Sequence, residues 1–146
     1  EVTWISALEM PEHIAALQAA LKNAEIKAPA PLHSDLLPAS TEKLPAYLPA
    51  DAHHGRVLTV TADLEDDLAD ALESDDVMVA VRLATWEDVE LLADCQYMLT
   101  KPLCILCDDA EVLEAALRAY QGRPLYEGAL PKSVLAPLAA KYGVLY

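Results

Sequence analysis

The chain has 146 residues, enough for one domain with a sizeable core, and 54% of them are apolar, which argues against intrinsic disorder. The formal net charge of −14 argues against nucleic acid and anionic membranes as partners, because the sequence offers no basic patch to overcome the repulsion. No apolar run approaches the roughly 20 residues that cross a bilayer. An odd set of three cysteines without secretory features predicts a cytosolic setting and no disulfides.

The first part of the chain divides into a helical segment and a Pro-rich arm. Pro11 suits the first position of a helix, and Ile14, Leu17 and Leu21 then fall on one face, so we expect residues 1–23 to be helical. Residues 24–55 hold five prolines with little periodicity, which predicts a linker or a wrapping arm. Several leucines and Tyr47 make this arm apolar enough that we expect it to pack on another part of the protein.

From residue 56 to residue 146 the pattern alternates between short apolar runs and amphipathic helices. The runs lack polar alternation, as expected for strands that are buried on both faces. Short connections between such units predict right-handed crossovers and an α/β fold with a parallel sheet of about five strands. The expected strands are 57–61, 77–83, 103–107, 124–126 and 144–146, and the expected helices are 64–72, 86–99, 110–120 and 133–142.

Local signals support several of these boundaries. Thr85, with Asp88 three residues later, is typical of a capping box. Gly122 and Gly143 stand where helices end with a left-handed residue. If Ser133 is the N-cap of the last helix, Pro137 removes only its first hydrogen bond, so the helix survives.

Two stretches of the chain carry a family resemblance. They are the sequence Met10-Pro11-Glu12-His13-Ile14-Ala15-Ala16-Leu17 and the βα repeats from Arg56 to Tyr146. In this order they resemble the cobalamin-dependent methionine synthase family. The first is similar to the helix that closes the homocysteine-binding barrel, and the second to the first five strands of the pterin-binding barrel. The resemblance implies methyl transfer from methyltetrahydrofolate to homocysteine, and a sheet that is open or a partial TIM barrel, since five strands cannot close an eight-stranded one.

The chain departs from this family where the chemistry would lie. The paired zinc cysteines would fall at Ser6 and Ala7, and neither residue supplies a thiolate. The family's pterin-binding carboxylates and amides would fall at Ala80, Arg82, Leu106 and Glu127. Each unpaired ring group costs roughly 1–3 kcal/mol in a dry site. We therefore expect no zinc, no tight folate binding, no cofactor and no catalytic residue in this chain.

Polar residues gather where the predicted strands end, which is where parallel α/β sheets bind ligands. Two interpretations remain open. One is an acidic pocket for a cation or an amine, with Arg82 as the counter-charge. The other is that Asp63, Thr85 and either Asp108 or Asp109 are helix N-caps, which capping alone favours. The candidate binding residues are Asp63, Arg82, Asp108, Asp109 and Glu127.

The cysteines and histidines have structural interpretations. Cys104 and Cys107 have the spacing of a redox or metal pair, but residues three apart in a strand point to opposite faces. Cys95 is expected to be a small core residue. A metal site formed by His33, His53 and His54 has no predicted supporting partner, so we expect these side chains to be solvated.

Two functional hypotheses follow. In the first, the chain is a methionine-synthase-like segment, inactive alone, whose partners are other domains of a larger methyltransferase. In the second, it is a non-catalytic interaction or scaffold domain that associates through sheet edges or the Pro-rich arm, a second copy being one partner. A weaker third hypothesis is an enzyme for small molecules that uses Asp108 and Glu127.

Overall fold

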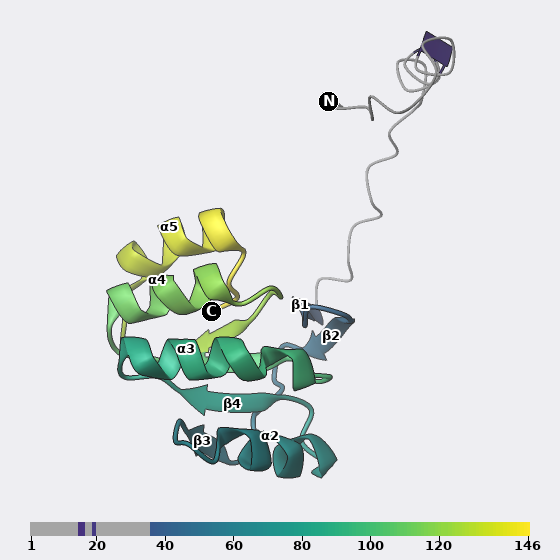
Figure 1. Ribbon diagram of the computed structural model, residues 1–146. Helices are drawn as coiled ribbons and strands as arrows, with labels where there is room; N and C mark the ends of the chain where they lie inside the picture. Colours follow the sequence, from purple (N-terminus) through teal and green to yellow (C-terminus); the bar gives the residue numbers. More distant parts are fainter. Residues whose placement is uncertain (1–14, 17–18, 20–35) are drawn as a thin grey trace. The chain divides into compact units, whose positions relative to one another are not determined.

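The computed structural model describes residues 15–16, 19 and 36–146, and the predicted features of residues 1–14, 17–18 and 20–35 lie outside these ranges. From β3 onward, strands and helices alternate, as the sequence predicts (Figure 1). The strands β3, β4, β5 and β6 form a parallel sheet in chain order. They span Val57–Thr59, Val79–Arg82, Leu103–Leu106 and Leu125–Glu127. The fold is therefore α/β with a parallel sheet.

The sheet has four strands, and the predicted fifth is a single bridge. Leu145 pairs in parallel with Leu125 on the outer side of β6. The Tyr126 amide donates to the Leu145 carbonyl at 2.7 Å, and the Leu145 amide donates to the Pro124 carbonyl at 3.0 Å. The last residues of the chain therefore occupy the outer edge of β6.

Four helices cover one face of this sheet in chain order (Figure 1). They are α2, Leu64–Glu73; α3, Trp86–Cys95; α4, Ala110–Ala119; and α5, Lys132–Tyr142, with a short 3-10 helix, Gln96–Met98, after α3. Side chains of alternate strand residues, such as Val81 and Ile105, are fully buried against these helices. Strands in sequential order joined by crossovers of one hand place every helix on the same face. The opposite face therefore needs a different cover.

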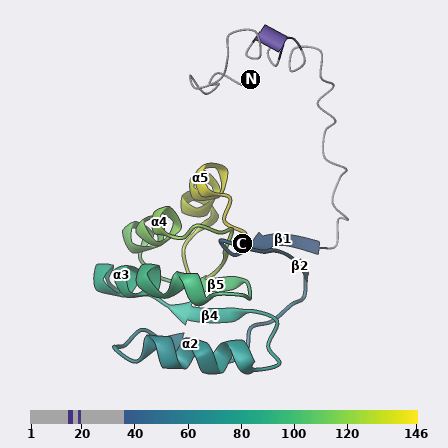
Figure 2. The same ribbon diagram turned by 45° about the vertical axis from the view of Figure 1, so that its right-hand side comes forward.

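A β-hairpin within the Pro-rich arm supplies that cover. Strands β1, Leu36–Ser40, and β2, Pro45–Pro49, pair antiparallel. Ala39 and Leu48 pack in one buried cluster with the strand residues Ala80, Cys104 and Leu106. Figure 2 shows the hairpin away from α3, α4 and α5. The sequence predicts an apolar arm over residues 24–55 that packs on another part of the protein, and its residues 36–49 do pack on the sheet, but the sequence does not predict regular strands there.

The prolines fit the hairpin because of where they fall in its ladder. Pro49, Pro38 and Pro45 belong to every second residue pair along the two strands. Antiparallel strands alternate between hydrogen-bonded and non-hydrogen-bonded pairs, so prolines in the second class remove no ladder bond. The amide of Ser40, opposite Pro45, points out of the hairpin and donates to the Arg123 carbonyl at 3.0 Å, as this assignment requires.

The same Ser40 fastens the hairpin to the loop between α4 and β6. The Arg123 amide donates to the Ser40 carbonyl oxygen at 2.9 Å, and the buried Tyr120 hydroxyl donates to it at 3.1 Å. A Cβ placed on Gly122 would overlap this carbonyl oxygen. Gly122 is therefore required for a close approach, and the predicted left-handed helix end is wrong there, since only Gly143 has a positive φ, 76°, among the described residues.

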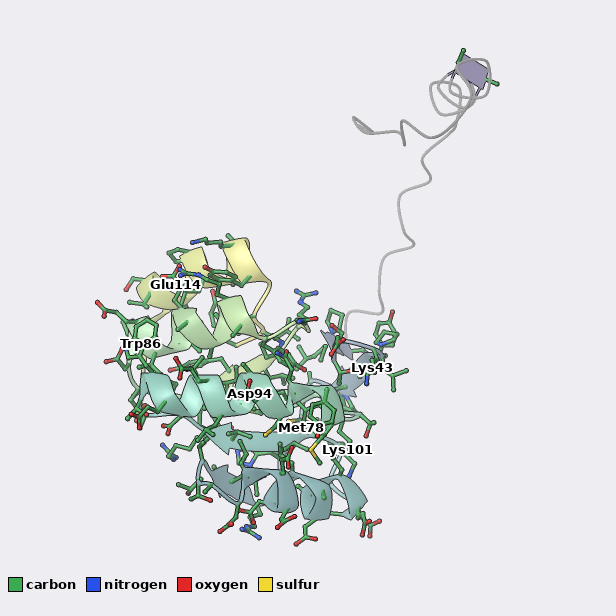
Figure 3. All side chains as sticks on the ribbon, viewed as in Figure 1. Lys43, Met78, Trp86, Asp94, Lys101 and Glu114 are labelled. Atoms are coloured by element: carbon green, nitrogen blue, oxygen red, sulfur yellow. The ribbon has the colours of Figure 1, made fainter. Side chains whose placement is uncertain are left out.

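Side chains add contacts between neighbouring elements (Figure 3). Lys43, in the hairpin turn, donates to the Tyr97 carbonyl at 3.0 Å. On α4, Glu114 accepts hydrogen bonds from Lys141 and Tyr142 on α5, both at 2.9 Å, and these bonds lower the pKa of its carboxyl group. The Glu114 carboxylate therefore links α4 to the end of α5.

The last helix begins earlier than predicted. Its N-cap is Pro131, so the bond that Pro137 cannot donate falls within the second turn and is not the first of the helix. The Leu135 amide still bonds the Pro131 carbonyl at 3.2 Å, and Gly143 ends the helix in the left-handed conformation. The prediction about Ser133 is wrong, but the helix forms. Within residues 36–146, no helix has the length and apolar character needed to cross a bilayer.

We predict that Gly122→Ala lowers the free energy of unfolding by about 1–3 kcal/mol, the usual cost of overpacking a tight contact. The added methyl group must push Ser40 away, which loosens the hairpin. Urea unfolding followed by circular dichroism measures the change. The exposed neighbour provides the control, Gln121→Ala, for which we expect little effect; equal stability of the Gly122 variant and the wild type would contradict the close approach.

Candidate functional site

The last residues of the four strands form one row across the sheet. Thr59, Arg82, Leu106 and Glu127 are register partners from β3 to β6. Register partners point to the same face, and Leu106 packs in the cluster with the hairpin. Arg82 and Glu127 therefore flank an apolar side chain on the face opposite the helices. Two strand spacings, about 10 Å, separate their backbones, and each pairs with another residue, Arg82 with Asp108 and Glu127 with His54.

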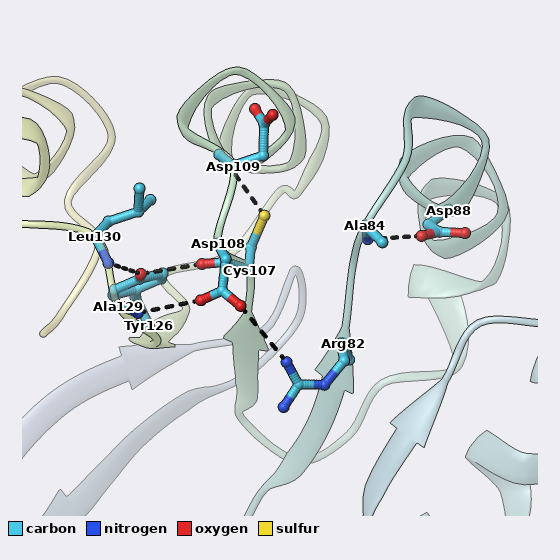
Figure 4. Close-up of polar contacts among 9 residues, drawn as sticks. All are labelled: Arg82, Ala84, Asp88, Cys107, Asp108, Asp109, Tyr126, Ala129 and Leu130. Carbon is cyan, nitrogen blue, oxygen red and sulfur yellow. Dashed lines mark hydrogen bonds and ion pairs between the residues drawn. The ribbon is translucent and has the colours of Figure 1, made fainter.

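Arg82 instead turns towards the loop after β5 (Figure 4). Its Nη1 lies 4.0 Å from Oδ2 of Asp108, and both side chains are more than half exposed. Such a surface pair contributes about 0–1 kcal/mol. Arg82 therefore lies beside one carboxylate of this acidic edge, that of Asp108.

Asp108 also connects two loops at the carboxyl edge. Its Oδ1 accepts a hydrogen bond from the Ala129 amide, in the loop between β6 and α5, at 3.2 Å. Close by, the Tyr126 hydroxyl donates to the Cys107 carbonyl and accepts from the Leu130 amide, each at 3.0 Å (Figure 4). Asp108 and Tyr126 thus hold together the loops that follow β5 and β6, at the edge where parallel sheets bind ligands.

The helix-cap interpretation fits two of the remaining residues. Asp109 accepts bonds from the Glu111 and Val112 amides at 2.8 and 3.1 Å, and Thr85 forms the predicted capping box with Asp88. Asp63 stands at the N-cap of α2, but its side chain makes no capping bond. Both aspartates face solvent at separate helix starts.

Glu127 points to a different place. Its Oε2 lies 3.1 Å from Nε2 of His54, and the other ring nitrogen of His54 lies 2.9 Å from the Gly55 carbonyl oxygen. The His54 side chain is only 20% exposed, so the expectation that it is solvated is wrong. The five predicted residues are therefore distributed over the Arg82–Asp108 pair, two helix starts and the Glu127–His54 pair.

The thiols are placed for packing. Cys104 lies in the cluster with the hairpin and Cys107 in the cluster with the helices, which confirms that they point to opposite faces. Burial raises the pKa of Cys104 to about 12 and raises that of Cys107 and Cys95. All three thiols are therefore neutral near pH 7 and poor nucleophiles.

Within residues 36–146 together with the few described helical positions before them, no three His, Cys, Asp or Glu side chains are grouped to hold a metal ion. The Ser6 and Ala7 positions and His33 lie outside the described residues. Comparison with protein-family models, with curated proteins and with solved structures gives no match.

We predict that Tyr126→Phe lowers the free energy of unfolding by about 1–3 kcal/mol, because it leaves the Cys107 carbonyl and the Leu130 amide without a partner. Thermal unfolding measures the loss. The matched control is Tyr97→Phe, which removes a hydroxyl that bonds Glu65 at an exposed position. A loss of equal size in both variants would show that the Tyr126 contacts are not what holds these loops.

Proposed function

We propose that this chain is a non-catalytic interaction domain built on the βα architecture. The observation that carries the proposal is the covered face of the sheet. In a βα barrel this face lines the interior, but here Ala80 and Leu106 are 0% and 7% exposed beneath the hairpin. These are positions where the resembling family carries ring-binding groups. The buried thiols are neutral and poor nucleophiles, which also favours a non-catalytic role.

The edge strand β3 is the place where a partner joins. It has one strand neighbour among the described residues, whereas the opposite edge, β6, bonds Leu145. Unpaired backbone groups on an edge can accept a further strand from another chain.

The negative charge of helix α2, beside β3, favours a partner with a positive charge. Asp67 on α2 bonds Arg56, the residue before β3, at 2.9 Å, which places the acidic helix next to this edge. A second copy would bring another acidic helix close, and like charges disfavour that contact. An extended segment rich in lysine or arginine fits better. The acidic residues of α2 are Glu65, Asp66, Asp67, Asp70 and Glu73.

A peptide of alternating lysine and valine tests this proposal. We expect it to bind and to shift the amide resonances of residues 57–59 most strongly, while a matched peptide of glutamate and valine does not bind. Thr59→Lys should weaken binding several-fold, because lysine on an edge strand opposes pairing. Ala69→Lys, on the exposed side of α2, adds the same charge away from the edge and is the control.

Equal weakening by both lysine variants would show unspecific attraction to the acidic surface and would overturn the edge assignment. Sedimentation of the chain alone completes the test. A monomer at every concentration fits a basic partner, and a concentration-dependent dimer would identify a second copy as the occupant and contradict the charge argument.

A second candidate function is a methionine-synthase-like segment for methyl transfer from methyltetrahydrofolate to homocysteine. The strand order supports it, because sequential parallel strands with all helices on one face are the arrangement of part of a TIM barrel. The closed inner face weighs against activity by this chain alone.

Calorimetry separates the two candidates. We expect no measurable heat when methyltetrahydrofolate or homocysteine is added, since Ala80 and Leu106 stand where the resembling family carries ring-binding groups and the hairpin covers both. Tight, saturable binding of methyltetrahydrofolate would favour the methyltransferase segment over the interaction domain.

A further inference from the structure

A cavity of about 340 Å³ lies beside the hairpin on the sheet face opposite the helices. Side chains of three strands or strand starts, Met78, Cys104 and Leu125, contribute to its lining, and these residues belong to the cluster that packs with the hairpin. Residues 52–54, which follow the hairpin, line it as well. The volume is at the small end of the roughly 300–1,000 Å³ that is usual for ligand pockets.

The segment 52–54 is held at two points, one on the hairpin and one on the sheet. The Ala52 amide donates to the Pro49 carbonyl at 2.9 Å, and His54 contacts Glu127 at 3.1 Å. His54 thereby directs the Glu127 carboxylate to the cavity, which both residues line. Its Oε2 is the atom that contacts His54, and Oε1 has no hydrogen-bond partner within the part of the chain that the structure describes.

The lining has an uncharged part and one carboxylate. The Cys104 thiol is neutral because burial raises its pKa to about 12, and Met78 and Leu125 are apolar. Glu127, with a side chain that is 63% exposed, places its carboxylate at the solvent side. This combination matches a ligand with an apolar body and one positively charged donor group.

We propose that this cavity binds a small primary amine, with the ammonium group on Glu127 Oε1 and the apolar body against Met78, Cys104 and Leu125. His54 is a positioning residue that fixes the carboxylate through Oε2. The site is independent of the β3 edge and extends the proposed function by a small-molecule ligand.

Titration with 2-phenylethylamine, followed by amide chemical shifts, tests the proposal. We expect saturable shifts at residues 104, 125 and 127, and no binding of the neutral analogue 2-phenylethanol or the anion 3-phenylpropionate at equal concentration. Glu127→Gln should weaken binding about tenfold, as expected for loss of one charge-assisted hydrogen bond. The exposed Glu111→Gln on α4 makes the same change of net charge and should leave the affinity unaltered.

A variant that fills the cavity gives a second test. Ala52→Trp adds bulk from a partly buried position in the cavity wall. We expect a protein that keeps the wild-type circular dichroism spectrum and no longer binds the amine. Equal weakening by the two glutamine variants, or amine binding by Ala52→Trp, would overturn the site. Equal binding of 2-phenylethanol would overturn the assignment to amines. None of these outcomes depends on the peptide experiment at β3.

Discussion

The structure depends on one constraint: a parallel sheet whose strands follow chain order receives all its helices on a single face. The crossovers have one hand, so α2 to α5 bury one set of alternate strand residues and leave the other set exposed. Apart from Thr59, Arg82 and Glu127 at the carboxyl ends, those residues are small or apolar, and each exposed leucine-sized side chain forgoes about 1.5–3 kcal/mol of burial. A complete barrel solves the problem by closing on itself. This chain solves it with the hairpin β1–β2.

The position of the hairpin explains where the polar chemistry of the molecule can lie. It covers Ala80 and Leu106, which removes this part of the sheet as a binding surface. Polar side chains then remain at the carboxyl edge and around the segment that leaves the hairpin. At the carboxyl edge, Asp108 and Tyr126 are engaged in holding loops. The Glu127–His54 pair borders open space, and the amine site is assigned there for that reason.

The alternation of strands and helices could be predicted because each element carries its own local signal. The run from Leu103 to Leu106 is apolar at every position, and the Thr85–Asp88 capping box forms as predicted. These signals act over a few residues, so the sequence alone contains them. A helix start without such a signal is placed less accurately, as the early beginning of α5 at Pro131 shows.

The hairpin and the Glu127–His54 contact could not be predicted for the same physical reason. Prolines usually mark loops, and their compatibility with β1 and β2 depends on which pairs of the ladder they occupy. The Glu127–His54 contact joins residues 73 positions apart. In the sequence, Asp63 and Asp109 are acidic residues near predicted strand ends, as Glu127 is, but in the fold they lie at helix starts. Residue type identifies polar groups that follow predicted strands, but the grouping of these residues is a property of the tertiary fold.

The Ser40–Arg123 connection has a consequence for how the molecule assembles. It joins positions 83 residues apart, whereas each βα unit is completed by contacts between near neighbours in the chain. Closing so long a loop carries an entropic cost, so the repeats are expected to collapse first and the hairpin to dock last. During synthesis from the ribosome, Ala39 and Leu48 emerge long before their sheet exists. The apolar face of the hairpin is then open to chaperones or to misassociation until Arg123 has been made.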